Sequence, residues 1–130
     1  MEKVENKRKI LIVDDNNDLT TVLVDKFNLS GFEAQGAFDG EEGLEKALEF
    51  HPDIILLDLL MPKVSGIEML KQLRKDSWGK EAKVVILTLL DNTGFVAKAM
   101  ESNIYGYIVK TDYTLDQIVK KIKDTLDGIK

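Results

Sequence analysis

The chain has 130 residues and a hydrophobic content of 44%, enough for one domain with its own core, which excludes disordered and collagen-like proteins. Its 18 basic and 23 acidic residues leave a net charge of −5, so direct binding to nucleic acid, which uses a basic patch, is not expected. No apolar stretch approaches the roughly 18 residues that span a bilayer, and residues 1–8 are too charged for a signal peptide, so we predict a cytoplasmic protein without membrane contact.

Five short segments are predicted to be β-strands. In chain order they are Ile10–Val13, Phe32–Ala37, Ile54–Leu57, Val84–Leu87 and Tyr105–Val109. The first, third and fourth are continuous apolar runs, which is typical of strands covered on both faces of a sheet. The second is polar enough for an edge strand, and the fifth is aromatic and β-branched.

Helices are predicted between and after these strands. In the first helix, the spacing of apolar residues predicts one buried face, made of Leu19, Val22, Leu23 and Phe27. The last helix carries one apolar stripe, made of Leu115, Ile118, Val119, Ile122, Leu126 and Ile129. Three helices are expected to begin at a capping side chain three residues before a Glu or Gln: Asp39 with Glu42, Ser65 with Glu68, and Thr114 with Gln117. Left-handed helix ends are expected at Gly31 and Asn103, and Pro52 ends another helix.

The strands begin about 20 to 30 residues apart, which is the length of one strand and one helix. The pattern therefore predicts a (βα)5 fold, a three-layer α/β sandwich around a five-stranded parallel sheet. No linker or internal repeat divides the chain, so we predict a single domain over residues 1–130 with a core of about residues 8–128.

Reactive polar residues follow four of the predicted strands. Asp14 and Asp15 end the first strand, Asp58 the third, Thr88 the fourth and Lys110 the fifth. In an open α/β sheet, ligands bind outside the carboxyl ends of the strands. We therefore expect three carboxylates, a hydroxyl and an ammonium group to converge at one edge of the sheet.

Such a cluster of carboxylates needs a cation, because neighbouring like charges disfavour ionisation. Lys110 supplies one positive charge, and the chain has no cysteine and one histidine, so a metal would be held by oxygen. An oxygen site with few protein ligands suits Mg²⁺, here on Asp14 and Asp15 with help from Asp58. A carboxylate beside Mg²⁺, a lysine and a hydroxyl can attack phosphorus and form an aspartyl phosphate.

Several motifs together resemble the receiver domain of two-component response regulators, over about residues 8–128. The sequence VDD at Val13–Asp15 resembles the acidic metal-binding pair of that family. The segment DLLMPKVSG at Asp58–Gly66 resembles its run of phosphoacceptor, Met-Pro and helix-opening glycine. Thr88 follows VVIL as the switch hydroxyl does, and YGYIVK contains Tyr107 and Lys110 where the family has its switch aromatic and its phosphate-sensing lysine.

The resemblance implies a flavodoxin-like fold with strand order 2-1-3-4-5 and a signalling domain rather than a conventional enzyme. By that resemblance, Asp58 accepts a phosphoryl group from a histidine kinase or a histidine phosphotransfer protein. Mg²⁺ is then held by Asp14, Asp15, Asp58 and the backbone of Leu60. Phosphorylation changes the surface of the fourth helix, fifth strand and fifth helix, where an unidentified target protein binds. The resemblance is also compatible with a homodimer that forms on phosphorylation.

The chain departs from the family at four positions. Thr111 replaces the usual proline after Lys110, so a trans peptide bond is expected there. Leu89 replaces a small residue after Thr88, and its bulk would narrow access to the phosphoryl group and hinder an inward swing of the Tyr107 ring. Leu60 and Leu90 are apolar where relatives often carry polar groups that place the hydrolytic water. We therefore predict slow self-dephosphorylation.

Other functions fit parts of the pattern. A phosphorylation-independent pseudo-receiver, which only binds partner proteins, is compatible with the bulky Leu89. A flavodoxin-like electron carrier shares the sheet order, but its phosphate-binding loop would here contain Asp14, Asp15 and Asp18, which repel phosphate. A phosphohydrolase with an aspartate nucleophile commonly has a second aspartate two residues later, where this chain has Leu60.

Overall fold

Five parallel strands form one sheet in the order β2-β1-β3-β4-β5, in a computed structural model that describes residues 7–59, 61, 64–89, 97, 99–101 and 103–128. The strands are β1 (Lys9–Val13), β2 (Glu33–Ala37), β3 (Ile54–Leu57), β4 (Val84–Thr88) and β5 (Gly106–Val109). Each of the four neighbouring pairs is parallel. The predicted strand order is therefore confirmed, and so is the place of the polar segment β2 at an edge.

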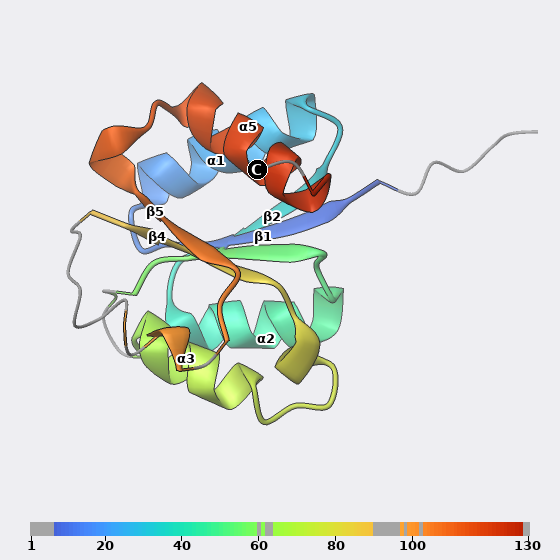
Figure 1. Cartoon of the computed structure of the whole chain (residues 1–130), viewed down its shortest axis with the longest axis vertical. Coiled ribbons are helices and arrows are strands. Elements are labelled where there is room, and N and C mark those ends of the chain that lie inside the picture. Colours follow the sequence, from blue (N-terminus) through green and yellow to red (C-terminus); the bar gives the residue numbers. More distant parts are fainter. Residues whose placement is uncertain are drawn as a thin grey trace, which may run out of the picture.

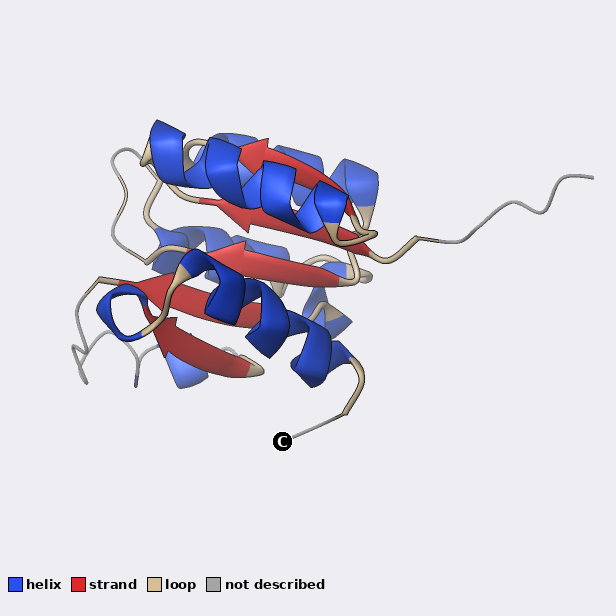
Figure 2. Ribbon diagram, turned by 90° about the horizontal axis from the view of Figure 1, so that it is seen from above, coloured by secondary structure: helices blue, strands red, loops and turns tan. Residues whose placement is uncertain are grey.

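Helices cover both faces of the sheet (Figure 1 and Figure 2). α1 (Asn17–Leu29) and α5 (Leu115–Leu126) lie on one face, and α2 (Gly40–Phe50) and α3 (Gly66–Leu73) lie on the other. Between β4 and β5, residues 97, 99 and 100 are helical. They belong to the fourth helix of the (βα)5 fold, whose bounds fall outside the described residues. Within the described residues, no helix combines the length and the apolar character needed to cross a membrane.

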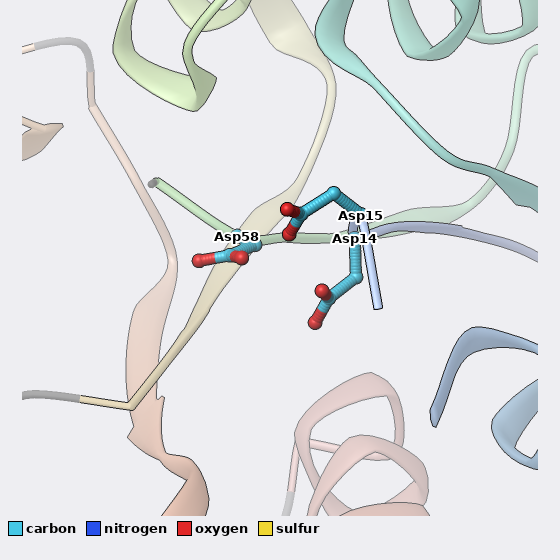
Figure 3. A group of neighbouring side chains, drawn as sticks. All are labelled: Asp14, Asp15 and Asp58. Carbon is cyan, nitrogen blue, oxygen red and sulfur yellow. The ribbon is translucent and has the colours of Figure 1, made fainter. Parts of the chain in front are cut away.

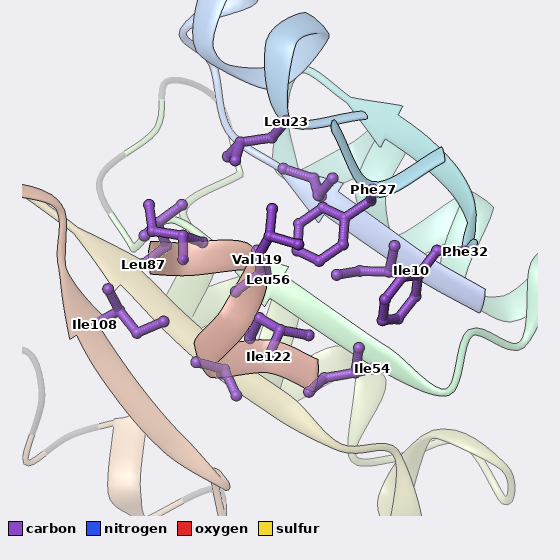
Figure 4. Packing of buried hydrophobic residues seen from close by; sticks show 13 residues of the cluster. Ile10, Leu23, Phe27, Phe32, Ile54, Leu56, Leu87, Ile108, Val119 and Ile122 are labelled. Carbon is purple, nitrogen blue, oxygen red and sulfur yellow. The ribbon is translucent and has the colours of Figure 1, made fainter. Parts of the chain in front are cut away.

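Two hydrophobic clusters, one on each side of the sheet, explain why the central strands are continuously apolar. In β1, Ile10 and Ile12 belong to the cluster beneath α1 and α5, which Figure 4 shows. Leu11 and Val13 belong to the cluster beneath α2 and α3. Because successive side chains of a strand point to opposite faces, a strand between two helical layers buries every side chain.

The predicted helix ends are confirmed by their hydrogen bonds and backbone angles. The side chains of Asp39, Ser65 and Thr114 each accept the backbone N–H three residues on, and Thr114 with Gln117 forms a complete capping box. Gly31 and Asn103 have φ angles of 94° and 61°. These ends fix where each helix starts and stops, and therefore where the connecting loops meet the sheet.

The predicted buried face of α1 is wrong in one residue. Val22 is 40% exposed, whereas Thr20 is fully buried. The cause lies in β2, where Gly36 has no side chain and α1 packs close. A Cβ atom added at Gly36 would lie 2.8 Å from the Thr20 Cγ2 atom and 3.2 Å from the Val24 Cγ2 atom. The buried face of α1 is therefore turned toward Thr20 and Val24.

Side chains from the neighbouring helices occupy much of the open side of β2. In a parallel pair, alternate residues of a strand form hydrogen bonds to the neighbouring strand. In β2 the residues that flank Ala34 and Gly36 bond to β1, so the N–H and C=O groups of Ala34 and Gly36 point away from it. The Ala34 N–H donates to Asn28 Oδ1 at 2.9 Å, and the Gly36 carbonyl accepts from Lys46 Nζ at 2.6 Å. Just beyond the strand, the Phe38 N–H donates to Glu42 Oε1 at 2.7 Å.

Candidate functional site

Three carboxylates meet at the carboxyl ends of β1 and β3 (Figure 3). One oxygen from each of Asp14, Asp15 and Asp58 lies within 4.8 Å of the others. Asp14 and Asp58 are 1% and 6% exposed, and Asp15 is exposed. The register of the central strands explains the meeting, because Val13 lies beside Leu57 and the next residue of each strand is an aspartate.

The main chain and carboxylate of Asp14 are held by several groups. Its backbone N–H donates to the Ala37 carbonyl at 3.1 Å, and its Oδ1 accepts the Asn16 N–H at 2.9 Å. Its Oδ2 forms an ion pair with Lys110 Nζ at 2.5 Å. Among the described residues, this Oδ2 is a buried side-chain oxygen that accepts no hydrogen bond of good geometry. Beside its ion pair with Lys110, this buried carboxylate oxygen keeps a lone pair of the kind that a bound metal cation satisfies.

Lys110 brings positive charge to the cluster from the end of β5. Its side chain is 12% exposed, and Nζ lies 3.8 Å from Asp58 Oδ2. One ammonium group faces three carboxylates, so the cluster as described keeps an excess of negative charge. That charge and the all-oxygen donor set fit a divalent ion such as Mg²⁺.

A pocket of about 420 Å³ lies over these groups. It is lined by Asp14, Asp15, Asn16, Asp58, Leu89 and Lys110. Leu89 is 59% exposed, so the residue predicted to narrow the site does stand at the pocket wall. The pocket is open to solvent and lined mainly by charged groups, which suits a small charged ligand better than an apolar one.

Two other predicted residues lie in the last two strands of the sheet. Thr88 is the last residue of β4 and is 3% exposed. Tyr107 lies in β5 beside Ile86, with 43% of its surface exposed. The Lys110–Thr111 peptide is trans, as expected, since the described residues contain no cis bond. Leu60 and Leu90 lie outside the described residues.

The loop after Asp58 returns tightly against the start of α3. The Gly66 N–H donates to the Leu59 carbonyl at 3.1 Å. A Cβ atom added at Gly66 would lie 2.1 Å from the Asp58 carbonyl oxygen and 2.7 Å from Leu59 Cα. The glycine is therefore required sterically, because the first turn of α3 lies against the backbone of Asp58.

Two residues beside the acidic cluster were not among the predicted site residues. Asn16 caps α1 with its side chain, accepting the Leu19 N–H at 3.0 Å, and it lines the pocket. Thr20 donates its hydroxyl to the Asp14 carbonyl at 2.9 Å. No sequence signal singles out Thr20, because its partner is a backbone carbonyl, which every residue has.

Comparison with known proteins agrees with this geometry. A family model described as response regulator receiver domain matches residues 10–123. Hybrid signal transduction histidine kinase D of Dictyostelium discoideum is 30% identical over 121 residues, which cover 93% of this chain and 8% of that protein. The probable transcriptional regulator ycf27 of Cyanophora paradoxa is 34% identical over 105 residues, covering 81% of this chain and 43% of that protein. The chain thus spans less than half the length of either relative.

Solved structures show the same fold. The chemotaxis protein CheY4 of Vibrio cholerae superposes with a TM-score of 0.85 at 26% identity, over 92% of this chain and 99% of that chain. A CheY-like receiver domain protein from Methanospirillum hungatei also reaches 0.85, at 25% identity, over 95% of this chain and 96% of that one. Since the family match spans most of the residues and the acidic cluster lies where the motifs predict it, this chain belongs to the family of response regulator receiver domains.

Proposed function

We propose that the protein is a phosphorylation-activated signalling switch in which Asp58 accepts a phosphoryl group. The observation that supports this most directly is the position of Asp58, a buried carboxylate 3.8 Å from the Lys110 ammonium and grouped with Asp14 and Asp15. An oxygen of the Asp58 carboxylate would bond to phosphorus while the bond between phosphorus and the donor's leaving group breaks. With a phosphohistidine donor, the leaving group is the imidazole nitrogen.

Each neighbouring group has a role in this proposal. Lys110 pairs with a phosphoryl oxygen, and the Thr88 hydroxyl donates to another. Asp14, Asp15, Asp58 and the backbone of Leu60, which lies outside the described residues, would hold Mg²⁺. When bound, Mg²⁺ supplies the positive charge that offsets the carboxylates and the phosphoryl oxygens.

The donor in this proposal is a histidine kinase or a histidine phosphotransfer protein. One relative is a hybrid histidine kinase and another a probable transcriptional regulator, by their names. We place the protein in the cytoplasm as a single receiver domain over residues 1–130, with a core of about residues 8–128. Its output would be a protein target rather than nucleic acid, and a phosphorylation-dependent homodimer belongs to the same proposal.

Incubation with Mg²⁺ and acetyl phosphate tests the chemistry, followed by intact mass. We expect the wild type to gain one phosphoryl group, and neither Asp58→Asn nor wild type in EDTA to gain it. The exposed Asp25 provides a matched control, because Asp25→Asn removes a carboxylate outside the pocket and should be labelled like the wild type. The adduct should then decay slowly, since Leu60 and Leu90 offer no polar group to place water.

The outcomes separate the competing functions. Labelling of Asp58→Asn would place the phosphoryl group elsewhere and contradict the proposal. A protein that gains no adduct and binds no Mg²⁺ would instead be a pseudo-receiver, the alternative that the exposed Leu89 at the pocket wall favours. An adduct that decays within seconds would contradict slow self-dephosphorylation alone.

Signal readout is proposed to run through Thr88 and Tyr107. If Thr88 moves toward the phosphoryl group, it vacates space that the half-exposed Tyr107 ring fills. This shifts the equilibrium between two packings of the surface formed by the fourth helix, β5 and α5. Thr88→Ala should therefore still be phosphorylated at Asp58, with a weaker change in the NMR signals of the Tyr107 ring on phosphorylation. Ring signals that change as much as in the wild type would argue against this route.

A further inference from the structure

Buried polar side chains in the described part of the chain are few. They are Asp14, Thr20, Asp58 and Thr88. Three of them belong to the candidate site, and the fourth, Thr20, lies at the end of the first turn of α1 and in none of the receiver motifs. A buried hydroxyl is retained only where it has a hydrogen-bond partner, and the partner of this one is part of the acidic site.

Thr20 holds the main chain of the acidic pair. Its Oγ1 donates to the carbonyl oxygen of Asp14 at 2.9 Å, and the side chain is fully buried. That carbonyl belongs to the peptide unit that joins Asp14 to Asp15. The hydrogen bond therefore fixes the peptide plane from which both carboxylates project.

The rest of the Asp14 main chain is fixed from another side. Its N–H donates to the Ala37 carbonyl of β2, while its carbonyl accepts from α1 through Thr20. The chain turns immediately afterward, because the Asn16 N–H returns to Asp14 Oδ1. Of these contacts, the one from Thr20 comes from a side chain outside the acidic cluster, so it can be removed without changing a carboxylate.

The methyl group of Thr20 has a separate task. It faces Gly36, where an added Cβ would lie 2.8 Å from Cγ2. With the methyl seated over this glycine, rotation about the Cα–Cβ bond is restricted, and the hydroxyl stays directed at the Asp14 carbonyl. Packing and hydrogen bonding at Thr20 can therefore be separated by substitution.

We infer that Thr20 is a positioning residue for the cation-binding carboxylates, acting through the Asp14 carbonyl. The inference rests on the proposed function of the acidic site. Without the hydroxyl, the buried carbonyl loses its donor and the peptide turns to find another, which displaces Asp14 and Asp15 together. Loss of such a supporting contact typically weakens metal binding by about 10-fold to 100-fold.

The test compares Thr20→Val, which keeps the methyl shape, with Thr20→Ser, which keeps the hydroxyl. Calorimetric titration of the full chain with Mg²⁺ should give a Kd about tenfold higher for Thr20→Val, and a Kd within about twofold of the wild type for Thr20→Ser. Thermal unfolding in EDTA measures the stability of each variant without metal, so that a loss of stability can be compared with a loss of Mg²⁺ binding. Thr20→Ser loses the packing on Gly36, so a merely structural role would weaken its Mg²⁺ binding as well.

A second readout needs no metal. The Asp15 amide shares its peptide unit with the Asp14 carbonyl, so in EDTA its NMR resonance should shift in Thr20→Val and stay near the wild-type position in Thr20→Ser. If Thr20→Val does not fold, Thr20→Ala replaces it, since alanine and serine at this site differ only by the hydroxyl.

Two results would overturn the inference: wild-type Mg²⁺ affinity in Thr20→Val, or an equal loss in Thr20→Ser. A wild-type chain that binds no Mg²⁺ would refute the proposed function instead, and the Asp15 resonance alone would then decide whether Thr20 positions the acidic pair.

Discussion

Replacement of Gly66 by alanine is expected to lower the free energy of unfolding by about 3 kcal/mol. The added Cβ would fall 2.1 Å from the Asp58 carbonyl oxygen and 2.7 Å from Leu59 Cα. Both are backbone atoms, so no side chain can rotate away to make room. Either the start of α3 or the backbone that carries Asp58 must move.

Urea denaturation measures this loss, and Gly106→Ala is the matched control. A Cβ atom added at Gly106 meets no atom within 4 Å, so that variant should stay within about 0.5 kcal/mol of the wild type. Equal stability of the two variants would show that the backbone after Asp58 can move to accept the added methyl group without lowering the free energy of unfolding. The close approach of α3 to Asp58 would then not be a constraint on the site.

Replacement of Lys110 by methionine is expected to destabilise the protein by about 3 kcal/mol in buffer free of divalent cations. The ammonium lies 2.5 Å from Asp14 Oδ2 and 3.8 Å from Asp58 Oδ2, and both carboxylates are buried. Removing one partner of a buried ion pair leaves the remaining charge without compensation, which costs more than the pair itself contributes.

Added Mg²⁺ should recover much of this loss, because a ligand that binds only the folded state stabilises it by mass action. Thermal unfolding with and without Mg²⁺ measures the recovery. Lys121 is exposed on α5 and outside the pocket, so Lys121→Met should change stability little in either buffer. If Lys110→Met were as stable as Lys121→Met without metal, Lys110 would not compensate the acidic cluster.

Strand-level features were largely predictable because they depend on short patterns. Ile54–Leu57 was predicted residue for residue, since a strand buried on both faces needs no alternation. Phe32 was placed in a strand, but β2 begins at Glu33. The Phe32 ring instead packs edge-on against Phe27, with ring centroids 5.1 Å apart. Such a contact between residues in different elements leaves no trace in local periodicity.

The candidate site was partly predictable for a topological reason. Parallel strands all end at the same edge, so Asp14, Asp58 and Lys110 could be brought together without any knowledge of their contacts. The face of α1 could not be predicted in the same way. Apolar spacing favoured Val22, whereas the space over Gly36, which exists only once β2 lies beneath the helix, buries Thr20.

The side chains along the open side of β2 also bear on how the protein behaves when it is concentrated. A strand from another molecule could pair with β2 only after displacing Asn28 and Lys46, whose side chains already bond to Ala34 and Gly36. The Glu42 carboxylate likewise already accepts the N–H of Phe38, just beyond the strand. Because the outermost strands of a sheet are the usual templates for intermolecular β-aggregation, these three polar residues limit sheet growth at this edge.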